Sequence, residues 1–465
     1  MSWVSQSIGR AQCSGVNAPY GRGSVIMRTG LRLLSRHHRE GYFAHYARLL
    51  ALLFACQLLG GQTRVSAAKP KGPEVQHKTT PKPVSSAKDF VHQALTIARK
   101  IPIENAASLA PFFESLYRRQ TEELPGPTRI LHYGDSHTAA DFFTGELRLL
   151  LQAKFGNGGS GFSMPGKPWP SYRRADVRSG SSQGWRTSGL IGKKGDSIDG
   201  LSGISMTART PRETLFIDAD AASFELYYYR QPDGGSVQVL DKGKQVDTVS
   251  TAGPAGAGYY RTTLGGPVHR HRLELQTTDA TPVRLFGWVA ENPSGVTYEA
   301  LGINGAQVGT LQHWDAEILS KNLEHRNPNL IVLWFGTNEA GNNLTQAQYE
   351  AQYLLTLQRL RAAAPDVPIL ILSPLDRAVR AGQVWKTMTS MTTVVEAQRN
   401  AARVAGCAFV DLRAKMGGAG SMLRWVEAGL AQPDRAHFNN AGYKALARVV
   451  FDNLMAEYDR YVAGR

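Results

Sequence analysis

Cysteine is scarce in this chain, which limits how the fold can be stabilised. Only three cysteines occur among 465 residues: Cys13, Cys56 and Cys407. If export removes the N-terminal segment that carries the first two, Cys407 remains alone and no intrachain disulfide can form. Cys407 lies in the apolar stretch 404–410 and is expected in the core. No cluster of His, Cys and Asp has the spacing of metal ligands, so neither a metal nor a cofactor is expected.

The globular part lacks a large excess of one charge, although the chain as a whole carries a formal net charge of +15. Residues 1–67 contain eight arginines and one glutamate, and residues 68–88 contain five lysines and one glutamate. The remaining residues, 89–465, therefore carry only +4. This mild charge gives no reason to expect nucleic acid as a partner.

No apolar run is long enough to predict a membrane span with assurance. The run at residues 49–59 follows Arg39 and Arg48, and small residues at 65–67 fit a cleavage site. This pattern predicts an export segment over residues 1–67, with an uncleaved anchor as the alternative and Met27 as an alternative start. Residues 68–88, rich in lysine and proline, are expected to form a linker that can reach away from a membrane. We therefore expect the protein in the periplasm or cell envelope.

Helical and strand patterns alternate over residues 89–159 and 291–465, which predicts an α/β domain with a doubly wound parallel sheet. Helices are expected at residues 89–101, 105–120, 136–155, 346–363, 394–405 and 440–461. Strands are expected at residues 128–134, 298–303, 330–335, 368–373 and 408–412. Polar segments follow several of these strands at their carboxyl ends, where ligands bind in open α/β sheets.

Residues 160–290, called the insert below, have a different texture. Short apolar runs alternate with Gly, Asp, Ser and Pro turns, which predicts an all-β sandwich that interrupts the α/β domain. Asp233-Gly234-Gly235 and Asp241-Lys242-Gly243 are interpreted as hairpin turns. Strands are expected at residues 214–217, 223–229, 236–240, 245–249, 271–276 and 283–289.

Ser136 and the pair Asp434 and His437 are the candidate catalytic residues. Ser136 stands in Gly-Asp-Ser-His directly after the apolar run 129–131, and Asp434 precedes His437 by three residues. A serine hydroxyl becomes a useful nucleophile when a base takes its proton. A histidine is such a base when a carboxylate holds its tautomer and balances its charge.

Two further segments offer hydrogen-bond donors for an oxyanion. Gly305 lies in Asn-Gly-Ala after the strand expected at 298–303, and it can bring its backbone N–H close to a ligand because it has no Cβ. Asn338 lies in Gly-Thr-Asn-Glu after the strand expected at 330–335, and its side-chain amide can donate to the same oxygen.

The order of these four segments resembles the signature blocks of the SGNH (GDSL-type) hydrolases. The resemblance implies a three-layer α/β/α fold, Ser136 as nucleophile, His437 as base oriented by Asp434, and Ser136, Gly305 and Asn338 as oxyanion donors. His137 stands where leucine is usual, and Gly-Asp-Ser-His-Thr resembles a subset that acts on polysaccharide acetyl groups. Substrate-lining roles are expected for Asp135, His137 and Trp425, with packing as the alternative for His137.

With the insert and the export segment, the chain resembles bacterial peptidoglycan O-acetylesterases, in which a β-domain like a carbohydrate-binding module interrupts the hydrolase domain. The resemblance implies an exported serine esterase whose partner is an acetylated polysaccharide. Three alternatives stay open: an O-acetyltransferase using the same site, an esterase acting on lipid or aryl esters, and a glycan-binding wall protein without catalysis. The oligomeric state is not predicted.

Three weaker signals are set aside. Residues 156–161 have the glycine spacing of a dinucleotide site but follow a helix instead of a strand. Ser182, in Gly-Ser-Ser-Gln-Gly, lacks the strand and helix that a nucleophile elbow requires, so it is interpreted as a loop serine. The aromatic residues of the insert could form a surface that stacks on sugars or could pack in the core, and packing is favoured. These residues are Tyr227, Tyr228, Tyr229, Tyr259, Tyr260 and Trp288.

Overall fold

A five-stranded parallel sheet organises the part of the chain predicted to be a hydrolase domain (residues 89–159 and 291–465, called the hydrolase part below). The computed structural model describes residues 86–192, 195–263 and 268–465. The predictions for residues 1–85 lie outside these described residues, which belong to one compact unit. No helix in the described part is both long enough and apolar enough to cross a membrane. The strands, in spatial order, are β13 (Val296–Gly302), β1 (Thr128–Gly134), β14 (Leu330–Trp334), β15 (Ile369–Leu372) and β18 (Ala408–Val410).

Apolar residues fill both faces of this sheet. In β14 the side chains of Ile331 and Leu333 belong to one core cluster, while Leu330, Val332 and Trp334 belong to the other. Successive side chains of a strand point to opposite faces, so a strand covered by helices on both sides must be apolar throughout. This requirement explains why the sequence predicts these strands within two residues of their ends.

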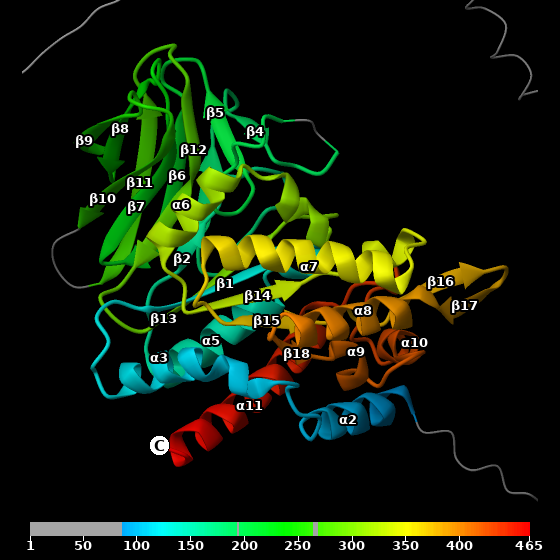
Figure 1. Ribbon diagram of the computed structural model, residues 1–465. Helices are drawn as coiled ribbons and strands as arrows, with labels where there is room; N and C mark the ends of the chain where they lie inside the picture. Colours follow the sequence, from blue (N-terminus) through cyan, green and yellow to red (C-terminus); the bar gives the residue numbers. More distant parts are fainter. Residues whose placement is uncertain (1–85, 193–194, 264–267) are drawn as a thin grey trace, which may run out of the picture. The chain divides into compact units, whose positions relative to one another are not determined.

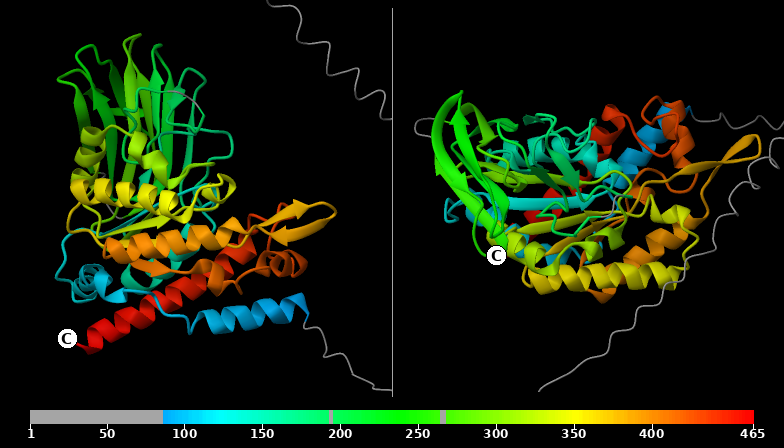
Figure 2. Two further views of the ribbon diagram at one scale, coloured as in Figure 1. Left: turned by 45° about the vertical axis from the view of Figure 1, so that its right-hand side comes forward. Right: turned by 90° about the horizontal axis from the view of Figure 1, so that it is seen from above.

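Helices cover the sheet on both sides and complete a three-layer α/β/α arrangement, as expected (Figures 1 and 2). One layer contains η2 (Val308–His313), α6 (Ala316–Arg326), α7 (Gln346–Ala363) and α8 (Ser390–Val404). The other contains α2 (Ala87–Ala98), η1 (Ala106–Leu109), α3 (Ala110–Gln120), α5 (Phe143–Phe155), α9 (Leu412–Lys415), α10 (Ser421–Glu427) and α11 (Asn440–Ala463). Two short helices, α4 (Ser136–Ala139) and η3 (Glu339–Gly341), lie at strand ends.

The insert forms two antiparallel sheets packed face to face, which confirms the predicted sandwich (Figure 1). One sheet has the order β10 (Gly256–Thr263), β7 (Ser223–Arg230), β12 (Val283–Glu291), β5 (Ser205–Ala208) and β4 (Arg186–Ser188), with β2 (Gly161–Ser163) paired to β12. The other has the order β3 (Arg178–Ser181), β6 (Thr214–Ala221), β11 (His269–Thr277), β8 (Ser236–Asp241) and β9 (Lys244–Ser250).

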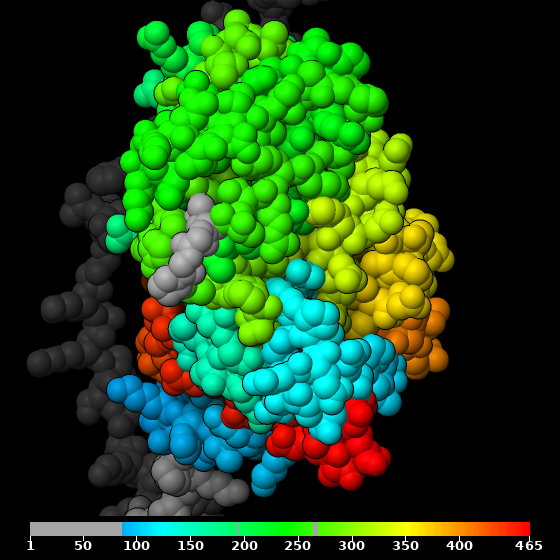
Figure 3. Space-filling model, turned by 90° about the vertical axis from the view of Figure 1, so that its left-hand side faces the viewer, coloured from blue at the N-terminus to red at the C-terminus, as the bar shows by residue number. Residues whose placement is uncertain are grey.

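Both faces of strand β7 are buried, which decides the role of its tyrosines. Leu226 and Tyr228 belong to the sandwich core, whereas Tyr227 belongs to the core shared with α6, α7 and α8. The insert therefore packs against the hydrolase part along one sheet. Figure 3 shows the green insert bordering directly on the yellow-green segments that include α6.

Several elements, among them α6, α10 and β10, were not predicted, and four further details differ from the predictions. The expected helix 136–155 is broken at Asp141, whose φ of 51° and buried ion pair with Arg148 (2.8 Å) separate α4 from α5. The capping box of Ser86 and Asp89 starts α2 at Ala87, inside the predicted linker. Residues 233–235 form no hairpin, because β7 and β8 lie in different sheets, whereas the turn at 241–243 does join β8 to β9. A hairpin of β16 (Ala378–Ala381) and β17 (Val384–Thr387) was not predicted.

A buried ion-pair network joins the end of the insert to the hydrolase part. Arg326 on α6 pairs with Glu291 at the end of β12 (2.6 Å) and with Glu299 on β13. All three side chains are at most 3% exposed. Burial would raise the pKa of Glu291, but Arg326 and Arg129 outweigh it and hold that pKa at about 2. Removing one member would leave a buried charge without its partner.

We predict that Arg326→Met lowers the free energy of unfolding by about 3–5 kcal/mol, because Glu291 and Glu299 then lose a buried guanidinium. Arg129→Met is the matched control, since Arg129 also contacts Glu291 (2.8 Å) but keeps 20% of its side chain exposed. Its loss should be less than half as large. Urea denaturation of both variants measures the difference, and equal losses would show that the buried Arg326 contributes no more to the network than the partly exposed Arg129.

Candidate active site

Three neighbouring strands end at one edge of the sheet, and each is followed by a predicted site residue. Gly134 of β1 is in register with Gly302 of β13 and with Trp334 of β14. Ser136 lies two residues after the end of β1, Gly305 three residues after the end of β13, and Asn338 four residues after the end of β14. The strand order corresponds to 2-1-3-4-5 in chain order, which places β1 and β14 on either side of the switch point where such sheets bind ligands.

Ser136, His437 and Asp434 form a continuous hydrogen-bonded series. The Oγ atom of Ser136 lies 2.8 Å from Nε2 of His437, and Nδ1 of His437 lies 2.7 Å from Oδ2 of Asp434. Ser136 is the first residue of helix α4. This helix can pack closely over β13 because Gly302 has no side chain: a Cβ at that position would lie 2.2 Å from the backbone nitrogen of Ala139. This arrangement suits proton transfer from the serine hydroxyl to the imidazole.

The loop before α11 holds Asp434 in a defined orientation. Its Oδ1 accepts hydrogen bonds from the backbone N–H groups of Ala436 and His437, both at 3.0 Å. Burial tends to raise the pKa of Asp434, but these donors and the His437 ring outweigh it and lower the pKa below its usual value. Asp434 is therefore a carboxylate at neutral pH and can stabilise a protonated His437.

Gly305 and Asn338 lie next to each other across the strand ends. Gly305 has a φ of 80°, a conformation that glycine adopts without strain. The Nδ2 atom of Asn338 donates to the carbonyl of Ala306 at 2.9 Å. That bond uses one N–H of the amide and leaves the other for a ligand. The two segments predicted to bind an oxyanion are thus held together.

Glu339 connects the same two segments, a role that the sequence analysis did not assign. Its Oε1 accepts from the backbone N–H of Val308 (2.7 Å), and its Oε2 accepts from that of Gly336 (2.9 Å). The carboxyl group is buried, and burial raises its pKa. The hydroxyl of Tyr349 also donates to it (3.3 Å). The sequence signal was an acidic residue four positions beyond the fully apolar stretch 330–335, where burial without partners is costly.

The structure corrects the prediction that Asp135, His137 and Trp425 line the substrate site. All three are at most 1% exposed, so substrate cannot reach them in this structure. Asp135 caps α4 through the N–H of His137 (2.9 Å), and burial raises its pKa to about 8. Trp425 stacks on Phe438 beneath the histidine loop, with ring centroids 4.4 Å apart.

His137 is a packing residue, the alternative considered from the sequence. Its ring stacks on Trp334, and its Nδ1 lies 2.6 Å from the hydroxyl of Tyr443. Burial lowers the pKa of His137 well below its usual value. The imidazole of His137 points into the core, whereas Nε2 of His437 lies within hydrogen-bond distance of Ser136 Oγ. His437 is therefore the histidine placed to accept the serine proton.

Of the weaker signals, Ser182 lies in a loop after β3 and hydrogen-bonds to Glu213, as a loop serine would. Cys407 is buried, as expected. In the described residues, no group of three or more His, Cys, Asp or Glu is placed to hold a metal ion.

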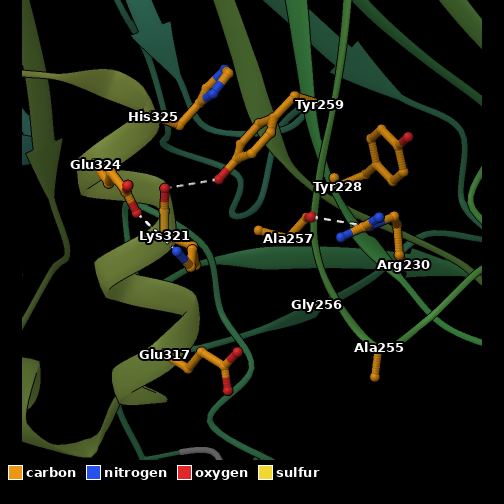
Figure 4. A pocket seen from close by; sticks show the side chains of 11 residues that line it. Tyr228, Arg230, Ala255, Gly256, Ala257, Tyr259, Glu317, Lys321, Glu324 and His325 are labelled. Carbon is orange, nitrogen blue, oxygen red and sulfur yellow. Dashed lines mark hydrogen bonds and ion pairs between the residues drawn. The ribbon is translucent and has the colours of Figure 1, made fainter. Parts of the chain in front are cut away.

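A groove of about 550 Å³ lies apart from the triad, between β10 and α6 (Figure 4). Its side chains interact mainly with each other: Tyr259 stacks on His325 with ring centroids 3.6 Å apart, and Lys321 pairs with Glu324 at 3.0 Å. The Tyr259 hydroxyl donates to the backbone of Lys321 (3.0 Å). This groove is part of the joint between the insert and the hydrolase part.

Among solved structures, this chain is similar to one that is described as an enzyme. A structure described as a peptidoglycan O-acetylesterase in action is 29% identical, with a TM-score of 0.66, and the match covers 75% of this chain and 96% of that one. A family two carbohydrate esterase from Cellvibrio japonicus is 11% identical with a TM-score of 0.27, covering 61% and 98%. The second likeness is too distant to support any argument.

Sequence comparison agrees with the structural one. No curated protein matches the chain. The pattern of the GDSL-like lipase/acylhydrolase family matches residues 256–445, which include Gly305, Asn338, Asp434 and His437 but not Ser136. The match begins within the insert, at the start of β10, so most of the insert separates Ser136 from the matched part, and the fold reunites Ser136 with His437 at one edge of the sheet. Residues 256–445 are therefore similar to the GDSL-like lipase/acylhydrolase family.

Proposed function

We propose that the protein is an exported serine esterase that removes O-acetyl groups from peptidoglycan. The observation that carries the proposal is the hydrogen-bonded series of Ser136, His437 and Asp434 at the carboxyl edge of the sheet. The likeness to a peptidoglycan O-acetylesterase, which extends over three quarters of the chain, supports the choice of substrate. The export pattern in residues 1–67 supports a location where that substrate occurs.

In the first half of the reaction, Ser136 is acetylated. The Oγ atom attacks the acetyl carbonyl while Nε2 of His437 takes the hydroxyl proton. The carbonyl oxygen gains negative charge, which the N–H groups of Ser136 and Gly305 and the free amide N–H of Asn338 stabilise. The bond to the sugar oxygen then breaks, and His437 returns the proton to that oxygen. The sugar leaves with a free hydroxyl group.

In the second half, water releases the acetyl group. His437 takes a proton from water as its oxygen attacks the acetyl carbon, and the bond to Ser136 Oγ breaks. The same proton returns to Ser136, and acetate leaves. Asp434 stays ionised throughout and balances the charge of the imidazolium in both halves.

The direct test is acetate release from O-acetylated peptidoglycan by residues 81–465, the compact unit, with Ser136→Ala as control. We expect the substitution to abolish release, because no other group supplies the nucleophile. Serine-dependent cleavage of an aryl acetate alone would point to another natural ester or to transfer of the acetyl group to a sugar. Inactivity of the folded protein on both esters would favour a glycan-binding role.

Asn338→Ala should reduce kcat about a hundredfold and change KM by less than about threefold, because its amide stabilises charge that exists only in the transition state. Steady-state kinetics on an aryl acetate separate the two parameters. A variant with raised KM and unchanged kcat would show that Asn338 binds the substrate in its ground state instead.

Glu339 is expected to be a positioning residue. Glu339→Gln should lower kcat about tenfold at nearly constant KM. Each oxygen of the carboxyl group now accepts a hydrogen bond from one backbone N–H, and the glutamine NH2 group would face one of these donors with another donor. Tyr349→Phe, which removes the 3.3 Å contact with Glu339 and the acceptor of Gln398 Nε2 (3.0 Å) but leaves both backbone donors of Glu339 in place, is the matched control and should lower kcat less. If Glu339→Gln lowers Tm but leaves kcat intact, its role is limited to stability.

A further inference from the structure

The hairpin of β16 and β17 carries Trp385, which is not part of any apolar cluster described above. The hairpin stands out from the body of the hydrolase part (Figures 1 and 2). Trp385 is partly exposed, and among the tryptophans of the described residues it alone neither belongs to nor packs against one of the three apolar clusters. An aromatic side chain without a core to fill is typical of a binding surface.

The hairpin is fixed directly to the catalytic loop. The guanidinium of Arg435, which stands between Asp434 and His437 in the chain, lies 3.9 Å from the ring centroid of Trp385. The backbone N–H of Ala378 donates to the carbonyl of Arg435 at 3.1 Å. Trp385 is therefore held beside the loop that orients the catalytic base.

The base of the hairpin is also tied to the oxyanion segment and to the core. Arg377 donates to the backbone carbonyl of Thr337, the residue before Asn338, at 3.0 Å. Thr387 donates to Asp376 (3.3 Å), a fully buried carboxylate that pairs with Arg413 (3.1 Å). These anchors fix the hairpin relative to the site.

Two arginines flank Trp385 on one face of the hairpin. Arg380 is its cross-strand partner, so both side chains lie on the same face, and Arg435 stacks on the ring. In the described part of the chain neither arginine has a carboxylate within ion-pair distance, and the guanidinium of Arg435 donates only to the carbonyl of Pro433. Lys386, next to Trp385 in the strand, lies on the opposite face.

We propose that the face formed by Arg380, Trp385 and Arg435 binds a carboxylate-bearing sugar unit of the glycan whose acetyl ester reacts at Ser136. The guanidinium groups match a carboxylate in charge and in planar geometry, and the indole ring offers an apolar surface to the C–H groups of a sugar. The inference rests on the proposed function, since it extends the same site from the ester to the neighbouring sugar.

The test measures binding in the Ser136→Ala background, where the probe is not consumed. The probes are a soluble fragment of alternating N-acetylglucosamine and N-acetylmuramic acid, and the same fragment with its carboxylates amidated. Arg380→Gln should raise Kd for the carboxylate form about tenfold and leave Kd for the amidated form within about twofold. Lys386→Gln removes the same charge from the opposite face and should change neither Kd more than about twofold.

Trp385→Leu should weaken binding of both forms, because the ring contacts the sugar whatever its charge. Equal effects of Arg380→Gln and Lys386→Gln would overturn the proposal in favour of general electrostatic attraction. Equal losses of affinity for the carboxylate and amidated probes on Arg380→Gln would also overturn it. Binding is measured without turnover, so serine-dependent acetate release with no effect of Arg380→Gln would refute this subsite alone. Absence of acetate release would refute the esterase function.

Discussion

The parallel order of five strands is the constraint on which the site depends. Parallel strands all end at the same edge, and a helix or loop must follow each one before the chain can return. β1, β13 and β14 are neighbours in the sheet, so Ser136, Gly305 and Asn338 emerge side by side although some 200 residues separate the first from the last. His437 arrives from the loop before α11 and closes the arrangement at 2.8 Å from Ser136.

The insert is accommodated without disturbing that edge because it packs against the hydrolase part along one sheet. Its strand β7 contributes Tyr227 to the core that includes α6. Where the insert returns to β13, Arg326 pairs with the carboxylates of Glu291 and Glu299, and Arg129 supplies the second positive charge. Aromatic stacking of Tyr259 on His325 adds to the same joint. A domain held by a buried charge network and a continuous apolar core keeps a fixed orientation, which suits a polymer substrate better than a loosely linked module would.

The sequence predicts what short-range physics determines. Fully apolar strands such as β14 and the spacing of Asp434 and His437 need only local pattern, and both were predicted. Burial of Asp135 and Trp425 was not. A polar residue beside Ser136 has the same sequence signature whether it faces a substrate or caps a helix, and Trp425 is buried by stacking on Phe438, a contact that no local pattern reveals. The helix break at Asp141 depends on Arg148 and on the N–H of Ala175, contacts that no local pattern reveals. Glu339 likewise acquires its role only when β13 and β14 lie on either side of β1, so that the segments following them meet.

Covalent labelling of the nucleophile tests the central claim most directly. The protein would be treated with a serine-directed sulfonyl fluoride and digested, and the modified peptide identified by mass spectrometry. The account predicts a single label on Ser136, formed much more slowly in a His437→Gln variant because the hydroxyl proton then has no acceptor. A label on another serine, such as Ser182 in its Gly-Ser-Ser-Gln-Gly sequence, or labelling of Ser136 that is independent of His437, would contradict it.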